Sequence, residues 1–177
     1  MSMDIIIAGF GGQGILFAGK MIAYCGMLEE KYVSWLPSYG PEMRGGTASC
    51  SVCVDEKNPI GCPMVSEPKL LMAMNLPSFN KYINDVAADG YVVYDSALIN
   101  AEVERKDLKV YAIPATNMAM ENGLKGLANI ILLGQAIKAA GFTTLDSMID
   151  AITKSIPAKK AHLLEPNIKA LKMGYEY

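Results

Sequence analysis

The stretch from Asp4 to Lys20, DIIIAGFGGQGILFAGK, constrains the fold of this chain more than any other segment. A short run of mostly β-branched residues, Ile5–Ala8, is typical of a strand that is buried on both faces of a sheet. Glycines follow, and apolar residues then recur with helical spacing from Ile15 onward. The segment therefore predicts a strand, a tight glycine turn and a helix, which together begin a βαβ unit.

The glycine turn fits the spacing G-x-G-x-x-G, in which each glycine has a mechanical role. The first makes the turn, the second lets a ligand approach the backbone, and the third lets helix and strand pack closely. Free amides in the first helical turn can bind an anion. Three interpretations stay open: a turn that only packs elements together, an anion or phosphate site, and a dinucleotide site. The candidate binding residues are Gly9, Gly11, Gly12, Gln13 and Gly14.

A nicotinamide or flavin dinucleotide also requires an acidic residue roughly 20 residues further on, at the end of the second strand, to hold the ribose. The second strand is expected at residues 32–35, and it runs into the sequence LPS without a carboxylate. Glu29 and Glu30 precede this strand and are therefore on its wrong side. The sequence argues against nicotinamide chemistry.

Length and composition limit the class of protein. We expect residues 1–177 to form a single domain with a good core. Hydrophobic residues make up 51% of the chain, yet no run approaches the roughly 20 apolar residues of a membrane span. The N-terminus does not resemble a signal peptide, which predicts a cytoplasmic protein. The net charge of −2, without a dense Lys/Arg cluster, argues against binding nucleic acid.

The apolar surplus includes twelve methionines. It predicts either surface buried against partner subunits or a methionine-rich core, and composition leaves both open. The four cysteines are expected to be free thiols. Cys50 and Cys53 form a C-x-x-C inside a predicted strand, where residues three apart point to opposite faces, so we expect buried structural thiols and no metal site. His162 is expected to be structural or interfacial, because no nucleophile motif accompanies it.

Apolar runs alternate with helical patterns along the rest of the chain, which predicts an α/β fold with a mostly parallel sheet and a helical C-terminal region. The strand at 47–54 can run antiparallel, because no helix separates it from the strand before it. We expect Thr143 or Thr144 to cap one helix, Gly141 to end another, and Pro166 to start, kink or split the last. Strands are expected at 5–8, 32–35, 47–54, 69–74, 91–94 and 108–113, and helices at 15–26, 77–86, 116–121, 124–140, 145–156 and 158–173.

A second motif, SYGPEMRGG, lies on the loop expected at residues 36–46. In open α/β sheets the carboxyl ends of the strands face the ligand crevice. Arg44 is therefore a candidate to bind a carboxylate or phosphate, with Glu42 orienting it. The alternative is a local Glu42–Arg44 ion pair on a solvated loop. Further along, Thr116 or Asn117 is expected to cap a helix, with ligand contact as the alternative. This adds Tyr39, Glu42, Arg44, Gly45, Gly46 and Asn117 to the candidate binding residues.

The two loops together, GFGGQGILFAGK and PSYGPEMRGGTASCSV, resemble the gamma subunit of 2-oxoacid:ferredoxin oxidoreductases, most closely the 2-oxoglutarate type. The resemblance covers essentially the whole chain, including EPNIKALKMGY near its end. Many nucleotide binders share the first motif, whereas YGPEMRGG is highly specific. The resemblance implies a Rossmann-like fold in a multisubunit enzyme that oxidises a 2-oxoacid with coenzyme A and ferredoxin.

The resemblance also implies partners. In that family the alpha and beta subunits hold thiamine diphosphate with magnesium, and the beta and delta subunits hold iron–sulfur clusters. The gamma subunit supports the assembly and, in related enzymes, lines the entry of coenzyme A. No catalytic residue carries over, so coenzyme A is a ligand hypothesis for the two loops. Related subunits act on pyruvate, branched-chain 2-oxoacids or indolepyruvate. A purely structural interface subunit, a free-standing NAD-dependent enzyme, and a homodimer of the isolated chain remain as alternatives.

Overall fold

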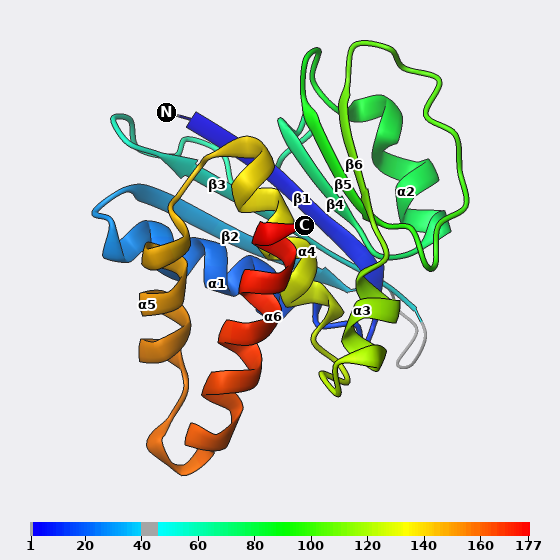
Figure 1. Cartoon of the computed structure of the whole chain (residues 1–177). Coiled ribbons are helices and arrows are strands. Elements are labelled where there is room, and N and C mark those ends of the chain that lie inside the picture. The colour runs from blue at the N-terminus through cyan, green and yellow to red at the C-terminus, as the bar shows by residue number, and fades with distance from the viewer. Residues whose placement is uncertain (1, 40–45) are drawn as a thin grey trace.

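The computed structural model describes residues 2–39 and 46–177, with the backbone alone at Tyr39 (Figure 1). Within these ranges the chain forms one six-stranded sheet and six α-helices, which confirms the expected α/β fold. Two short 3-10 helices, η1 and η2, follow α2 and α5. The strands are β1 (Ser2–Phe10), β2 (Tyr32–Tyr39), β3 (Thr47–Asp55), β4 (Leu70–Ala73), β5 (Tyr91–Asp95) and β6 (Lys109–Ile113). The helices are α1 (Ile15–Leu28), α2 (Leu76–Tyr82), η1 (Ile83–Asp85), α3 (Ala115–Glu121), α4 (Ala128–Ala140), α5 (Leu145–Ser155), η2 (Ala158–Leu163) and α6 (Leu164–Glu176).

The strands follow the order β2-β3-β1-β4-β5-β6. β1, β4, β5 and β6 are parallel, whereas β3 is antiparallel to both of its neighbours, β1 and β2. The antiparallel entry of β3 was anticipated from the sequence. β2 is longer than expected, because residues 36–39 continue the strand instead of beginning a loop. Pro37 is compatible with this because β2 lies at the edge of the sheet, where a missing N–H is tolerated.

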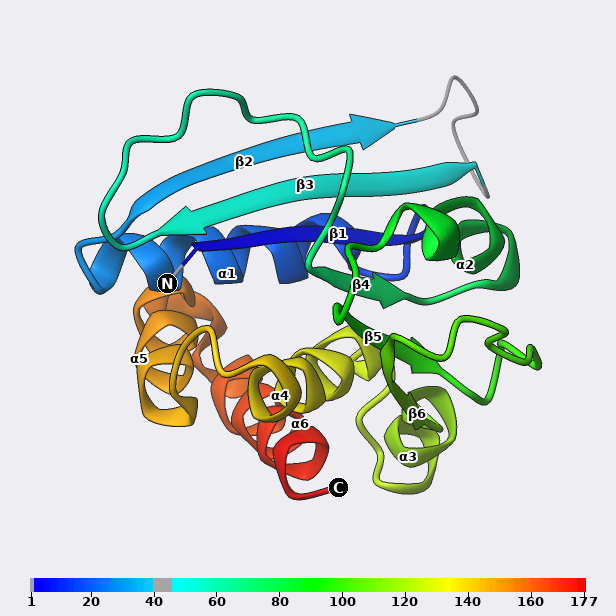
Figure 2. The same ribbon diagram turned by 90° about the horizontal axis from the view of Figure 1, so that it is seen from above.

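Two hydrophobic cores lie on opposite faces of the sheet, and helices flank both faces (Figures 1 and 2). Ile5 and Ile7 of β1 belong to the larger core, which α1, α4, α5 and α6 cover. Ile6 and Ala8 belong to the smaller core, which residues of α2 and of the 96–108 segment cover. The β-branched run at the start of the chain is therefore buried on both faces, as its composition predicted.

Local signals account for most helix boundaries. Thr144 caps α5 by accepting a hydrogen bond from the Ser147 amide at 3.1 Å, and Gly141 ends α4 in the left-handed conformation. Pro166 lies in the first turn of α6, which splits the expected 158–173 helix into η2 and α6. α4 begins later than expected, at Ala128, after two glycines with positive φ, Gly123 and Gly126. No helix in the described ranges is long and apolar enough to cross a bilayer.

The helical C-terminal region is held by a close contact between α4 and α6. A Cβ on Gly134 would lie 2.1 Å from the carbonyl oxygen of Leu171, and one on Gly174 would lie 1.8 Å from that of Ile131. These distances are too short for any side chain, so only glycine lets the two backbones meet. The packing fixes α6 against α4, which in turn lies against the parallel part of the sheet.

Candidate functional site

The glycine loop between β1 and α1 is clamped by the side chain of Gln13. Its Oε1 accepts a hydrogen bond from the Phe10 amide at 2.6 Å, and its Nε2 donates one to the carbonyl oxygen of Met74 at 2.9 Å. Gly9 leaves room for this clamp, because a Cβ there would lie 2.6 Å from Gln13 Oε1 and 2.7 Å from Ile15 Cδ1. One residue thus ties the loop to the ends of both β1 and β4.

Gly14 connects the loop to α4. It has a φ of 77°, which favours glycine, and its carbonyl oxygen accepts a hydrogen bond from Asn129 Nδ2 at 3.0 Å. A Cβ on Gly14 would lie 2.4 Å from the same nitrogen. Asn129 is 3% exposed and lies in the first turn of α4. The first turns of α1 and α4 are therefore fastened to each other through one residue pair.

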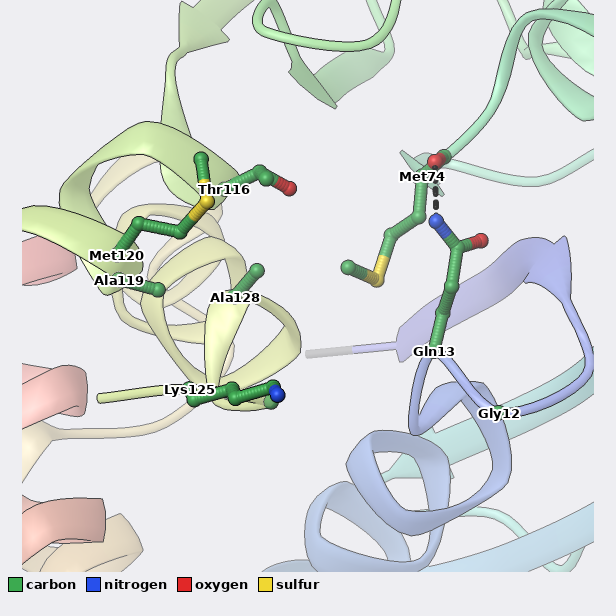
Figure 3. Close-up of a pocket in the computed structure, with 9 residues that line it drawn as sticks. Gly12, Gln13, Met74, Thr116, Ala119, Met120, Lys125 and Ala128 are labelled. Carbon is green, nitrogen blue, oxygen red and sulfur yellow. Dashed lines mark hydrogen bonds between the residues drawn. The ribbon is translucent and has the colours of Figure 1, made fainter. Parts of the chain in front are cut away.

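The glycine loop lies at the topological switch point of the sheet. β1 and β4 are adjacent and parallel, but the chain leaves β1 towards β2 and β3 and leaves β4 towards β5. Ligands of open α/β sheets bind at this point, outside the carboxyl ends of the strands. A pocket of about 270 Å³ occupies this position (Figure 3). The lining residues are Gly12, Gln13, Met74, Thr116, Ala119, Met120, Lys125, Gly126 and Ala128.

The pocket has two unlike sides. Gln13 and Met74 face it from the glycine loop and β4, and Thr116, Met120 and Lys125 face it from α3 and the approach to α4 (Figure 3). Its walls are mostly apolar, and Lys125 supplies one ammonium group. A second hollow of about 300 Å³ is also lined by Gly12, together with residues of the first turn of α1 and the exposed side chains of Phe10 and Phe17. Gly12 therefore borders both hollows.

Asp95, which sequence reasoning missed, builds the α3 side of the pocket. Its carboxylate is fully buried and accepts hydrogen bonds from the Thr116 amide at 3.1 Å, the Thr116 hydroxyl and the Ala97 amide. The expectation that Thr116 or Asn117 caps α3 is wrong, because Pro114 occupies the N-cap. The Thr116 amide in the first turn of α3 is instead bonded to Asp95, at the end of β5. A carboxylate directly after the apolar run 91–94 was the available signal.

The residues predicted to bind a ligand are partly brought together. The turn Gly9–Gly14 lies at the switch point, and Gly46 adjoins it because its carbonyl oxygen accepts a hydrogen bond from the Gly11 amide at 2.9 Å. Tyr39 ends β2 opposite Ala48, and Ala48 also pairs with Gly9 of β1. Asn117 is exposed on α3 and does not line the pocket. Glu42, Arg44 and Gly45 lie outside the described residues.

The match to a known family agrees with this geometry. Residues 4–177 match the family model described as pyruvate ferredoxin/flavodoxin oxidoreductase. This chain belongs to that family. The resemblance drawn from the two loops is confirmed, and so is the fold that it implied.

Sequence relatives place the chain among the gamma-type members of this oxidoreductase family. The 2-oxoglutarate synthase subunit KorC of Methanocaldococcus jannaschii is 34% identical over 179 residues, which cover 99% of this chain and 94% of KorC. The ketoisovalerate oxidoreductase subunit VorA of Methanothermobacter marburgensis is 38% identical over 173 residues, 97% of this chain but only 35% of VorA. The chain thus spans about a third of the length of VorA.

A solved structure agrees with the sequence relatives. The gamma subunit of the keto/oxoacid ferredoxin oxidoreductase from Geobacter sulfurreducens superposes with a TM-score of 0.81 at 26% identity, covering 98% of this chain and 96% of that one. The sheet and helices described above are therefore those of a gamma subunit of this family.

The four cysteines of this family member are free thiols, and three of them are buried. Cys50 and Cys53 are buried on opposite faces of β3, as expected: Cys50 Sγ lies 3.7 Å from the carbonyl oxygen of Ile15, and Cys53 Sγ lies 3.8 Å from that of Cys62. Burial raises the pKa of Cys50 to about 12, so it remains a neutral thiol. In the ranges that the structure describes, no three His, Cys, Asp or Glu side chains are grouped as they would be around a metal ion. His162 is exposed in η2.

Proposed function

We propose that this gamma-type chain provides part of the coenzyme A site in a cytoplasmic 2-oxoglutarate:ferredoxin oxidoreductase. In that reaction the 2-oxoacid loses carbon dioxide, its acyl group passes to the sulfur of coenzyme A, and the released electrons pass to ferredoxin. Thiamine diphosphate, magnesium and iron–sulfur clusters would belong to the alpha, beta and delta partners that the family resemblance implies. This chain would bind and position, and would not supply a catalytic residue.

The pocket at the switch point carries the proposal. Coenzyme A combines anionic phosphates with a long, mostly uncharged arm, so it needs an anion site next to an apolar hollow. The glycine loop and the first turn of α1 supply amides for anions. Met74, Met120 and the adjoining alanines supply apolar walls, and Lys125 supplies a cation in the same pocket. Arg44, in the motif SYGPEMRGG, would add a second cation.

The choice of 2-oxoglutarate rests on the relatives' lengths. KorC matches this chain over almost its whole length, whereas VorA is about three times as long. The ketoisovalerate relative is nevertheless slightly more identical, so ketoisovalerate is the first alternative substrate. Pyruvate and indolepyruvate follow. The pocket that selects the 2-oxoacid would lie in a partner subunit.

A purely structural role is the second candidate, and one observation favours it. Exposed apolar side chains surround the same edge of the sheet and would be buried by a partner. They come from the end of β1, the first turn of α1, the start of α2, the segment after β5, and α3: Phe10, Phe17, Leu76, Leu98 and Met120. On this account the loops make an interface and do not contact coenzyme A.

One experiment tests the subunit assignment that both candidates share. The tagged chain is purified with its partners from the native cytoplasm, and reduction of a viologen dye is measured with each 2-oxoacid, with and without coenzyme A. We expect activity that depends on 2-oxoglutarate and on coenzyme A. Dependence on ketoisovalerate instead would reassign the substrate, and a chain that purifies without thiamine and iron–sulfur partners would overturn the proposal.

Variants then test the binding role. Lys125→Ala and Arg44→Ala should each raise the KM for coenzyme A about tenfold, the typical effect of one lost charged hydrogen bond, without reducing the yield of complex. Lys159→Ala is the control for Lys125→Ala, because Lys159 is also an exposed lysine but lies in η2. If the yield of complex falls while the KM stays unchanged, the loops are structural.

A further inference from the structure

β6 is the last strand of the sheet, and its outer edge is free. Among the described strands it pairs only with β5. The Lys109 amide donates to the carbonyl oxygen of Gly90 on the β5 side, at 2.9 Å. Alternate residues of a strand direct their main-chain groups to opposite edges. The N–H and C=O groups of Val110 and Ala112 therefore point away from β5.

A hollow of about 490 Å³ adjoins β6. It is lined by Val110–Ala112 of β6, by residues of α4 and by Tyr177. Gln135 of α4 lines the hollow and is 6% exposed. Its Oε1 is buried and has no hydrogen-bond partner among the residues that the structure describes. A buried amide oxygen without a partner is costly, so each one calls for an explanation.

The hollow offers amides on two sides. The β6 edge supplies unpaired backbone groups, and Gln135 supplies a carboxamide. An extended peptide is the ligand whose own groups match both, because its backbone repeats the same donors and acceptors along a line. Lys138, which also lines the hollow, favours an acidic side chain on that peptide.

β2 forms the opposite edge of the sheet (Figure 2), and this edge is less able to accept an additional strand than the β6 edge. β2 carries Pro37 within its length, and a proline interrupts any ladder that another strand could form there. β6 contains no proline, and its sequence is KVYAI. Strand addition is thus obstructed at β2 and open at β6.

The relatives indicate which partner supplies the peptide. In VorA this domain is joined covalently to a further two-thirds of the same polypeptide, whereas KorC matches this chain over 94% of its own length. In a KorC-type subunit, which the proposed function takes this chain to be, a non-covalent contact would replace that covalent link. We propose that an extended segment of the subunit corresponding to the rest of VorA adds a seventh strand at β6, with its backbone hydrogen-bonded to Gln135. This inference rests on the proposed subunit function.

Hydrogen exchange in the purified complex tests the inference. Exchange is carried out on the complex and on the isolated chain, then quenched and read residue by residue. The amides of Val110 and Ala112 should exchange at least about tenfold more slowly in the complex, whereas Lys109 and Tyr111, already directed at β5, should change little. Unchanged rates at Val110 and Ala112 would overturn the inference. Equal slowing at all four residues would indicate general burial and not a strand, with the same consequence.

Two variants complete the test. Gln135→Leu should leave the isolated chain as stable as before or more so, because the amide oxygen has no partner among the described residues, yet should weaken the complex about fivefold to tenfold. Ala112→Pro should weaken it further. If wild-type chain forms the complex and both variants bind as tightly, strand addition is wrong. If wild-type chain forms no complex, the proposed function has failed instead. Protection that appears in the isolated chain at high concentration would assign the edge to a second copy.

Discussion

The side-chain amide of Asn129 reaches across 115 positions of sequence to the carbonyl oxygen of Gly14, 3.0 Å away. This bond joins the start of α1 to the first turn of α4. Together with the hydrogen bonds of the Gln13 side chain, it holds the glycine loop in place. The loop is therefore fixed before any ligand arrives, which lowers the entropy cost of binding.

Gly14→Ala should destabilise the chain by about 2 kcal/mol or more, because it forces a side chain into a left-handed conformation and against Asn129. Urea unfolding measures the change. Gly61→Ala is the matched control, since a Cβ there meets open space, and it should alter stability by less than about 0.5 kcal/mol. Equal effects of the two substitutions would contradict the role given to the Gly14–Asn129 contact.

Gln13→Leu should loosen the glycine loop, because it removes hydrogen bonds to Phe10 and Met74 while keeping a similar volume. Each lost bond costs about 1 kcal/mol, so we expect a loss of roughly 2 kcal/mol in unfolding free energy. The assembled complex should also show a higher KM for coenzyme A. A variant that lowers stability but leaves this KM unchanged would speak for a loop that only packs.

Gly174→Ala or Gly134→Ala should separate α4 from α6 and cost about 3 kcal/mol or more, because the obstructing atoms are backbone and cannot rotate away. Thermal unfolding followed by circular dichroism measures this. Lys172→Ala, at an exposed position of α6, should have little effect. A stable, cooperatively unfolding Gly174→Ala variant would show that the helices can move apart.

Acid should remove a contribution of Glu29 to stability. Partial burial raises the pKa of Glu29, but hydrogen bonds from Lys31, Thr143 and Ser147 outweigh it, so the pKa lies below its ordinary value of 4.5. The charged form is therefore favoured in the folded state. The contribution of Glu29 to stability is complete above the pKa that Glu29 has in the unfolded chain. It is lost as the pH falls through the lower pKa that Glu29 has in the folded chain.

The melting temperature measured against pH tests this. At neutral pH, Glu29→Gln should be less stable than wild type, and the difference should shrink as the pH drops below 4.5. Glu30→Gln changes the exposed neighbour and should not reproduce the effect. A difference that stays constant with pH would mean that the ionised form of Glu29 is not what matters.

Cys62 should be the first thiol to react in the native chain. Burial raises the pKa of Cys25 to about 11 and that of Cys50 to about 12, so neither forms a thiolate near neutral pH, and Cys62 alone of the four is exposed. Brief treatment with iodoacetamide at neutral pH, read by mass spectrometry, should label Cys62, and Cys62→Ser should abolish the fast label. Early labelling of Cys50 would contradict its buried position on β3.

Features that depend on neighbours in sequence were predictable. The apolar run Ile5–Ala8, the glycine turn and the Thr144 cap each carry their signal within a few residues. β2 was predicted too short, because Pro37 argues for a loop unless the strand is known to lie at an edge. Only the topology of the whole sheet supplies that knowledge.

The pocket was predictable mainly on one side. The glycine motif indicated the β1 side, and Thr116 was named as a possible ligand contact on the α3 side. Lys125 comes from a segment without a motif, and the only signal for Asp95 was a carboxylate after an apolar run. Asn129 and Gln135 resemble ordinary polar interruptions of an apolar helix. Their roles depend on contacts with residues far away in the sequence, and one sequence without aligned homologues does not reveal such pairs.

The position of β3 has a consequence for protein engineering. In a dinucleotide-binding sheet the second strand adjoins the first, so its terminal carboxylate can reach the ribose. Here β3 lies between β1 and β2, which moves the end of β2 away by one further strand spacing, about 4.8 Å. Placing an aspartate at the end of β2 would therefore not create a nicotinamide enzyme. A redesign with that aim would have to delete a strand and rejoin the chain.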